Sequence, residues 1–504
     1  MSVRVQGTAM RSENHRSGFV IMIVLFFAVI LALSLFAAAP LVTIGSKRVH
    51  TIAALKQAHY LAEIGIEEAI SSPLLFWREF SPASPIELGN GRVGRYTAVA
   101  RRSNDTIELE SRGYVSVGDQ RLAEKAIVCK LRMKLVSAPG PWSILSNAIA
   151  TSGNLNSGKV YVYLDEGVPP DVSADIYSDA EITNLAGEVP GSVFAQGRVV
   201  LNNGTLVKRD VIAKGDITLN NNTQVLGSII SAEGYVDVNN KVKVDGDIVA
   251  YGVDSKGYSV YIANSEVRDI YTQEGKTQVK LAPSARYNLI GKISDSPYPE
   301  AYVVPRRSLP VIDEGVRSMW IEMAKSDNLI YQGLTVNNNE NFLIRGNAFI
   351  QGNLVLNQNA VLNIEEGSIL YVTGRVIIEN NALIRVLDAN GDEKINFGSS
   401  LIAEDYFDVR NRAIPESVSL VALGTSTSYL RNNSVTTGAI LVPNGKLEIS
   451  NNAEVHGAIF AKEITKIGNN AEVYYNPLKA ASTLPPIANT PLASVLSLVE
   501  WIEK

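Results

Sequence analysis

Residues 193–250 read VFAQGRVVLNNGTLVKRDVIAKGDITLNNNTQVLGSIISAEGYVDVNNKVKVDGDIVA, and this stretch decides the fold. Short apolar triplets recur in it at spacings of 18, 18 and 19 residues. They are Val193-Phe194-Ala195, Val211-Ile212-Ala213, Ile229-Ile230-Ser231 and Ile248-Val249-Ala250. Each triplet is followed by a polar or glycine step, an alternating strand and an asparagine pair. A fixed period near 18 with short β-runs and Asn/Gly corners predicts a parallel β-helix, or β-solenoid.

The asparagine pairs are predicted to form the corners of the coils. Asparagine tolerates left-handed backbone conformations, and stacked amides can hydrogen-bond from one coil to the next. We expect Val193, Val211, Ile229 and Ile248 to form one inward stack. The pairs are Asn202-Asn203, Asn220-Asn221 and Asn239-Asn240, and they return at Asn337-Asn338, Asn357/Asn359, Asn380-Asn381, Asn432-Asn433, Asn451-Asn452 and Asn469-Asn470.

The repeat divides the C-terminal part of the chain. The solenoid is predicted over residues 147–252 and again over 331–478. Residues 253–330 lose the period and are predicted to be an insertion, with a helix over Val311–Lys325. The tail, residues 479–504, is predicted to cap the last coil with an amphipathic helix over Leu492–Glu503, because open strand edges invite aggregation.

A smaller strand-rich unit is predicted over residues 91–136, where apolar and polar residues alternate. Asn104-Asp105 and Gly118-Asp119 supply turn signals between the alternating runs. We expect a small antiparallel sheet that packs on a helix. Its four short strands are predicted at residues 96–100, 106–110, 114–117 and 125–128.

The N-terminus consists of a basic leader, residues 1–18, and a charge-free run, residues 19–44. An apolar run of this length can cross a bilayer as a helix. Basic residues ahead of it favour a cytoplasmic N-terminus, so the rest of the chain is expected outside the cytoplasm. One helix is predicted over residues 19–72, membrane-embedded first and amphipathic after that. Its expected apolar face is Ile52, Leu55, His59, Ala62, Ile66, Ala69 and Ile70.

Arg16-Ser17-Gly18-Phe19 followed by this apolar run resembles the processing site of type IV pilin-like proteins. The resemblance implies that a membrane prepilin peptidase cleaves after Gly18 and methylates Phe19. The segment His59–Ile70, HYLAEIGIEEAI, is similar to the helix end of the PilX-like minor pilin group. The last repeat, Asn469–Pro477, is similar to the closing motif of solenoid domains attached to such N-termini.

One position departs from the pattern of major pilins, which carry a glutamate five residues after the cut where this chain has Ile23. The resemblance therefore implies a minor or tip subunit of a type IV pilus or secretion pseudopilus, present at low stoichiometry. Its implied partners are other pilins, the assembly machinery and a surface or carbohydrate ligand. A signal-anchored envelope protein outside any filament is the alternative, and leader cleavage at Gly18 distinguishes the two.

Composition and motifs argue against most chemistry. A net charge of −5 without a basic stripe disfavours nucleic acid as a partner. The single cysteine, Cys129, excludes an internal disulfide and is predicted to be buried. No zinc spacing, nucleophile elbow or phosphate loop is present. We therefore expect neither catalysis nor a cofactor. The four histidines are His15, His50, His59 and His456.

A polysaccharide-active β-helix enzyme remains as a further alternative, because such folds place carboxylates together on one face. The densest acidic stretch lies between residues 165 and 181. It lacks the spacing of a calcium loop and is predicted to be a solvated loop. Its members are Asp165, Glu166, Asp171, Asp175, Asp179 and Glu181.

Overall fold

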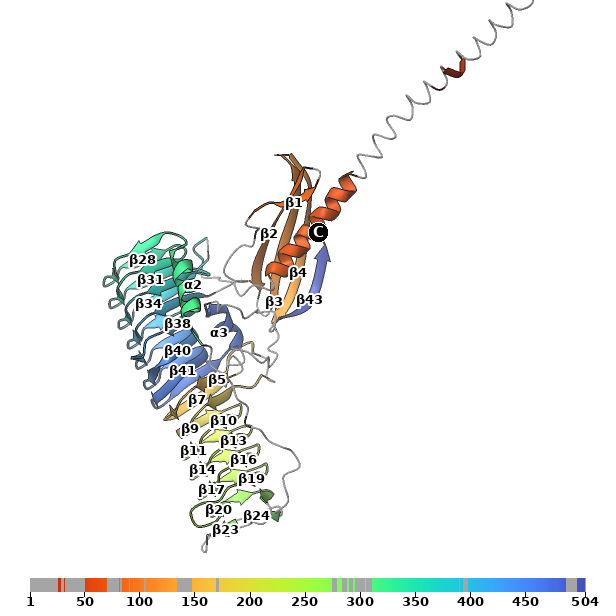
Figure 1. Ribbon diagram of the computed structural model, residues 1–504. Coiled ribbons are helices and arrows are strands. Elements are labelled where there is room, and N and C mark those ends of the chain that lie inside the picture. The colour runs from red at the N-terminus through yellow and green to blue at the C-terminus, as the bar shows by residue number, and fades with distance from the viewer. Residues whose placement is uncertain are drawn as a thin grey trace, which may run out of the picture.

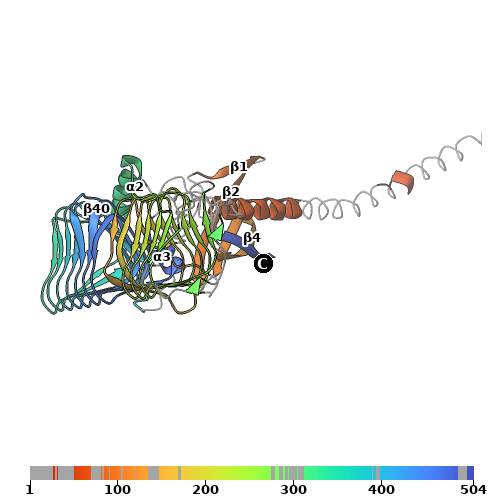
Figure 2. The same cartoon turned by 90° about the horizontal axis from the view of Figure 1, so that it is seen from below.

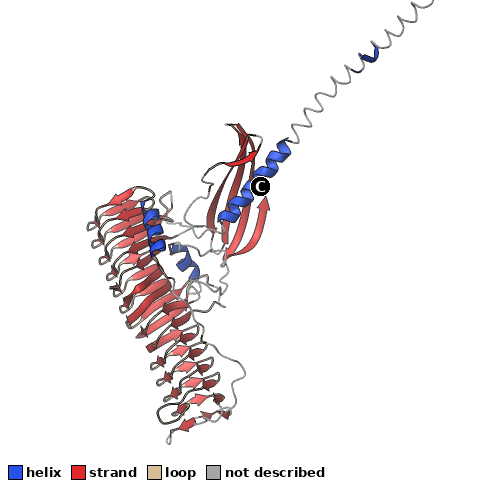
Figure 3. Cartoon of the chain, in the orientation of Figure 1, coloured by secondary structure: helices blue, strands red, loops and turns tan. Residues whose placement is uncertain are grey.

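The protein consists of a helix-and-sheet unit and a long β-solenoid that lies beside it (Figure 1). Figure 3 shows that strands dominate both units, as predicted. This computed structural model describes residues 26–28, 31, 50–69, 81, 84–89, 91–103, 106–118, 120–133, 147–168, 172–273, 279–282, 288–289, 293–294, 304, 311–388, 390–392, 398–485 and 496–503.

The smaller unit is a five-stranded antiparallel sheet in the order β1-β2-β3-β4-β43, with the helix of residues 50–69 on one face. Its β2 and β3 pair without interruption, so the break expected between residues 110 and 114 is wrong. Gly113 continues the ladder opposite Tyr96 and Lys125. The strands are β1 (Ile86–Gly89), β2 (Arg92–Ser103), β3 (Thr106–Val117), β4 (Gln120–Met133) and β43 (Leu496–Glu503).

Strand β43 corrects the prediction of a capping helix over Leu492–Glu503. It pairs antiparallel with β4, from Ile502 opposite Val128 to Leu496 opposite Met133. The apolar spacing suits a helix, but the same residues also fit a strand, and pairing satisfies the free backbone groups along the edge of β4. Consequently β4 and β43, which are neighbours in the small sheet, are separated in the sequence by the whole solenoid.

Each solenoid coil has three sides, which we call A, B and C in chain order. In the first half, side A holds β5 (Asn147–Thr151), β8 (Asp175–Ser178), β10 (Val193–Ala195), β13 (Val211–Ala213), β16 (Ile229–Ser231), β19 (Ile248–Ala250), β22 (Ile270–Thr272) and β25 (Ile293–Ser294). Side B holds β6 (Leu155–Asn156), β11 (Val199–Leu201), β14 (Ile217–Leu219), β17 (Val236–Val238), β20 (Val260–Ile262) and β23 (Val279–Leu281). Side C holds β7 (Lys159–Leu164), β12 (Leu206–Val207), β15 (Gln224–Val225), β18 (Lys243–Val244), β21 (Glu266–Val267) and β24 (Asn288–Leu289), while β9 (Ile182–Val189) turns from side B onto side C.

The second half repeats this plan with slightly longer coils. Side A holds β26 (Leu329–Tyr331), β29 (Ala348–Ile350), β32 (Ile369–Val372), β35 (Ser399–Ala403) and β38 (Val418–Ala422). Side B holds β27 (Leu334–Val336), β30 (Leu354–Leu356), β33 (Val376–Ile378), β36 (Phe407–Val409) and β39 (Thr427–Leu430). Side C holds β28 (Asn341–Ile344), β31 (Val361–Glu365), β34 (Leu383–Leu387), β37 (Ile414–Pro415) and β42 (Ala471–Tyr475), while β40 (Val435–Ile449) and β41 (Glu454–Ile467) run through all three sides.

The predicted inward stack is confirmed. Val193 pairs with Val211, Val211 with Ile229 and Ile229 with Ile248, all in parallel register. All four side chains have 0% exposure. These stacked aliphatic side chains form the core of the solenoid, and each coil depends on its neighbours for that burial.

The predicted asparagine ladder is also confirmed. The side-chain amide of Asn220 donates to the side-chain oxygen of Asn202 at 3.1 Å, and Asn239 donates to Asn220 at 3.3 Å. Corner residues adopt left-handed backbone conformations, for example Asn222 with φ of 58° and Asn381 with φ of 58°. Asparagine is therefore used both for its backbone tolerance and for its amide.

The predicted insertion over residues 253–330 is only partly present. Coils continue through β25, so the six strands from β20 to β25 belong to the solenoid. The spacing between paired side-B strands grows from 19 residues (Ile217 to Val236) to 24 (Val236 to Val260), which hid the repeat. The predicted helix is confirmed as α2 (Glu314–Lys325), which Asp313 caps by accepting from the N–H of Val316 at 2.9 Å.

The two halves stack in an order that the chain order does not suggest. The last coils, in β41 and β42, pair in parallel with the first, in β5, β6 and β7. The first half therefore winds from mid-length to one tip, and the second half begins at the opposite tip and winds back to the middle (Figure 1). We call the contact of β41 and β42 with β5, β6 and β7 the junction. The last coil is thus no free end and needs no cap.

Side A carries a second row of apolar side chains, on its outer surface. Successive side chains of a strand point to opposite faces, so the middle residue of each triplet points outward. Most of these middle residues are nevertheless buried, and α2, α3 (Pro477–Thr483) and Val304 pack against parts of the row; Phe194 and Tyr271 are half-buried, and Ile330 is exposed. We call this row the side-A seam. It runs through Ile330, Phe349, Tyr371, Ile402, Val421, Leu441, Phe460, Ala150, Tyr177, Phe194, Ile212, Ile230, Val249 and Tyr271.

Candidate functional site

The predicted processing residues, Gly18 and Phe19, lie outside the described residues. Of the charge-free run, residues 26–28 and 31 are described, and they are helical. Phe26 and Phe27 are 64% exposed and Leu31 is 65% exposed. Within the part of the chain that the structure describes, no helix is both long and apolar enough to cross a membrane.

The helix of residues 50–69 packs closely on the small sheet. Small side chains make this possible: Ala54 and Ala58 are 1% and 0% exposed, and a Cβ on Gly113 would lie 1.9 Å from the carbonyl oxygen of Ala58. Polar contacts add to it, since Arg92 donates to Gln57 at 3.1 Å. Other contacts are Tyr96 to Glu68, Arg92 with His50 at 3.2 Å, and His59 with Glu63 at 3.3 Å.

The apolar face expected for this helix is partly wrong. Ala62, Ile66 and Ala69 are buried as expected, but Ile52 and Leu55 are 55% and 40% exposed. Alanines at positions 54 and 58 face the sheet in their place, because larger side chains would not fit between the helix and the closely packed sheet.

Large apolar side chains remain on the side of the helix that the sheet leaves uncovered. Ile52, Tyr60 and Ile64 are 55%, 61% and 43% exposed, and we call them the outer helix face. Tyr60 and Ile64 are four residues apart and therefore neighbours on the helix surface. Both Figures 1 and 2 show this helix projecting from the sheet, away from the solenoid.

The acidic stretch between residues 165 and 181 does not form one cluster. Asp175 accepts from the N–H of Ser192 at 2.8 Å and from Ser173. Asp179 accepts from Tyr177, and Glu181 pairs with Arg198 at 2.9 Å. Asp171 lies outside the described residues. The predicted solvated loop is therefore, where described, a set of separate structural contacts.

Asp165 instead joins the two halves at the junction. Its carboxylate accepts from Lys479 of α3 at 2.7 Å and from Asn476 at 3.3 Å, and His456 lies 3.5 Å away. Burial alone would raise the pKa of Asp165, but Lys479, Asn476 and the N–H of Glu166 outweigh burial and hold this pKa below its ordinary value. Residues some 311 positions apart are thus tied together by one carboxylate.

This ion pair predicts a pH dependence of stability. A carboxylate with a lowered pKa in the folded state stabilises that state above the pKa of the unfolded chain, near 3.8. The contribution is lost as pH falls through the folded pKa. The wild-type protein is therefore expected to have a higher melting temperature than the Asp165→Asn variant at pH 7. The difference between the two melting temperatures is expected to shrink toward pH 3. Thermal unfolding of both proteins across this range is the measurement, and a difference independent of pH would contradict the assignment.

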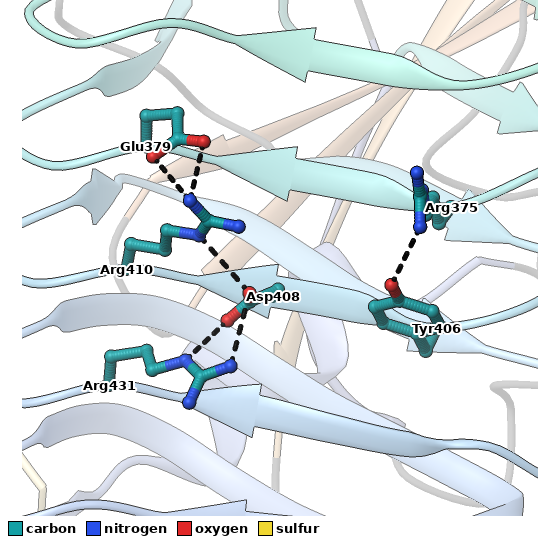
Figure 4. A network of polar contacts seen from close by, with 6 residues as sticks. All are labelled: Arg375, Glu379, Tyr406, Asp408, Arg410 and Arg431. Atoms are coloured by element: carbon teal, nitrogen blue, oxygen red, sulfur yellow. Dashed lines mark hydrogen bonds and ion pairs between the residues drawn. The ribbon is translucent and has the colours of Figure 1, made fainter.

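A second polar network lies on the outer surface of side B (Figure 4). Glu379 accepts from Arg410 at 2.7 and 2.8 Å. Asp408 accepts from Arg410 at 3.2 Å and from Arg431 at 2.7 and 3.2 Å, and its side chain is only 7% exposed. Arg375 donates separately to Tyr406 at 3.2 Å. Alternating charges therefore bridge three consecutive coils.

Sequence reasoning missed this network, although the separation of Arg410 and Arg431 by 21 residues, about one coil, was a usable signal. Glycoside hydrolysis requires one carboxyl that donates a proton and one that attacks or activates water. Here both carboxylates accept hydrogen bonds from guanidinium groups, so the arrangement serves coil-to-coil cohesion and does not form such a pair.

The other residues considered for chemistry occupy structural positions. Cys129 is buried, and burial raises its pKa to about 11, so the thiol stays protonated at neutral pH. His456 stacks on Tyr474 with ring centroids 4.5 Å apart. Among the described residues, no group of three or more histidine, cysteine or acidic side chains could hold a metal ion.

Comparison with known proteins finds a likeness among solved structures. No protein family matches the sequence, and no curated protein does. Among solved structures, the competence-associated pilin ComZ from Thermus thermophilus is similar at 11% identity, over 90% of this chain and 97% of that chain, with a TM-score of 0.19.

Proposed function

We propose that this protein is a pilin-like minor subunit of a type IV pilus or related pseudopilus, anchored in the membrane by its N-terminal helix. The proposal rests on the outer helix face. Ile52, Tyr60 and Ile64 stay exposed on a helix whose opposite face is fully packed. Apolar side chains exposed along a projecting helix mark a surface that packs against other helices or lipid. The mature chain would begin at Phe19, after removal of residues 1–18.

In this proposal the solenoid is the displayed part, and its role is structural. Both of its connections return to neighbouring strands, β4 and β43, so the small sheet serves as a mount. The solenoid would present a long, repetitive surface outside the cytoplasm for adhesion or tip display. Glu379 and Asp408 each form an ion pair with arginine, and this supports a structural role over catalysis.

The outer helix face gives the test. The double variant Tyr60→Glu, Ile64→Asp is expected to reduce the amount of this protein in sheared filaments at least tenfold, because charges at both positions cannot be buried between helices. Quantitative mass spectrometry of the filament and membrane fractions is the measurement.

The matched control is Val99→Asp, which places a charge at a 36% exposed position on the small sheet. This variant is expected to enter filaments normally. Equal incorporation of the double variant and wild type would refute the proposal. Loss from the membrane fraction as well would instead indicate a signal-anchored protein, whose helix contacts lipid only.

A further inference from the structure

The tip of the second half is an open coil. Its three strands, β26, β27 and β28, each pair with the next coil only, through β29, β30 and β31. Among the described residues no strand pairs with them on their other side. Edge strands carry unpaired backbone N–H and C=O groups that can pair with another chain.

Apolar side chains are exposed at this tip. Ile330 is 52% exposed and Leu343 is 45% exposed. Ile330 is the terminal residue of the side-A seam, and its neighbour in the seam, Phe349, is only 6% exposed. Helix α2 lies along the side of these coils and not over their end (Figure 1). The seam therefore continues to the tip and ends there uncovered.

The three edge strands also lack the features that usually protect an edge. Natural edge strands carry charged residues, prolines or bulges that block pairing. The strand sequences here are LIY, LTV and NFLI, without charge or proline. The charged residues of this coil lie in its corners, where Asp327 accepts from the N–H of Asn347 at 2.6 Å and Glu340 from that of Asn337 at 2.8 Å.

The junction shows that coils of this protein can pair without being consecutive in sequence. There Ile459 pairs with Ile149, Ile464 with Leu155, and Val473 with Val162, one contact on each side. A single extended peptide would cover one side of the open coil, whereas another coil of the same cross-section covers all three. A two-fold axis perpendicular to the solenoid would bring two such tips together with antiparallel strands.

We propose that the open coil formed by β26, β27 and β28 is a homotypic docking surface, on which the same coil of a second copy pairs tip to tip. This association is independent of the outer helix face, which lies on the other unit. Two solenoids joined in this way would form one continuous rod with a mount on each half.

Sedimentation of the full chain, extracted in mild detergent, tests the proposal. Wild type is expected to form dimers. The variants Ile330→Lys and Leu343→Lys are each expected to weaken this association at least tenfold, because they introduce like charges at the contact. Leu226→Lys, at a 40% exposed position far from the tip, is the matched control and should dimerise like wild type. Both substituted tip residues are exposed, so the variants are expected to keep the folded structure of the monomer, with unchanged circular dichroism.

A second measurement does not depend on those variants. Thr335→Cys places an exposed thiol on the open coil, while Cys129 is buried. A thiol-specific bifunctional reagent should then link two copies of this chain in intact cells. A monomeric wild type, dimers unaffected by either lysine, or linkage to a different protein would each overturn the proposal. The double variant Tyr60→Glu, Ile64→Asp should still dimerise, so this inference and the proposed filament role can fail separately.

Discussion

Gly187→Ala is expected to open the solenoid near its first coils, by about 3 kcal/mol or more. Gly187 has φ of 107°, a conformation that side chains disfavour, and a Cβ there would lie 1.8 Å from the carbonyl oxygen of Val160. The obstacle is the backbone of β7, which pairs with β9 at this point, so no rotamer change can relieve it. The coils must separate locally.

Gly204→Asn is the matched control. Gly204 also has a positive φ, 77°, but no atom lies within 4 Å of a Cβ placed on it. One coil later the same corner is occupied by Asn222, with φ of 58°. We expect this variant to stay within about 0.5 kcal/mol of wild type. Chemical unfolding with amide hydrogen exchange over β7 and β9 is the measurement, and equal behaviour of the two variants would contradict the packing described here.

Gly113→Leu is expected to separate the helix of residues 50–69 from the small sheet, at a cost of about 4 kcal/mol or more to this unit. The added side chain would collide with the backbone of Ala58, since even its Cβ would lie 1.9 Å from that carbonyl oxygen. Moving the helix away would in turn expose Leu61 and Ile66, which are 2% and 1% exposed.

Arg112→Leu provides the comparison for this prediction. Arg112 precedes Gly113 in β3, so its side chain points to the opposite face of the sheet. Its guanidinium pairs with Glu110 at 2.7 Å, but the Arg112 side chain is half exposed, and ion pairs in contact with water add little to stability. Limited proteolysis across residues 50–69 should therefore accelerate in Gly113→Leu and not in Arg112→Leu. Equal rates would show that the close helix contact is not needed.

The sequence was sufficient to predict the β-solenoid because its period is set by local chemistry. Stacked aliphatic residues such as Val211 and Ile229, and corner residues such as Asn220, make contacts only one coil away. The fully apolar triplets also indicate that the outer surface of side A is covered. In an alternating strand the middle residue should be polar, so Phe194 and Ile212 already indicated that something covers side A.

Other features depend on distant contacts and could not be predicted from local patterns. Coils of the two halves have similar chemistry, so nothing in residues 459–473 indicates that they pair with residues 149–162. Leu496 and Ile502 fit a helix as well as a strand, and the free edge of β4 decides between them. In the helix of residues 50–69, the apolar pattern placed Ile52 and Leu55 inward, whereas the short distance between helix and sheet selects alanine at the packed positions.

The stacking of the last coils on the first has a consequence for how the chain folds. Asp165 and Asn476 meet although 311 residues separate them, so the junction closes only after nearly all of the chain has emerged. If the chain is exported from its N-terminus, β5, β6 and β7 present an unpaired sheet edge during that whole interval. Contacts of such long range form slowly, and exposed edges aggregate. The rate at which β41 and β42 reach that edge therefore sets how long the newly emerged chain is exposed to misassembly.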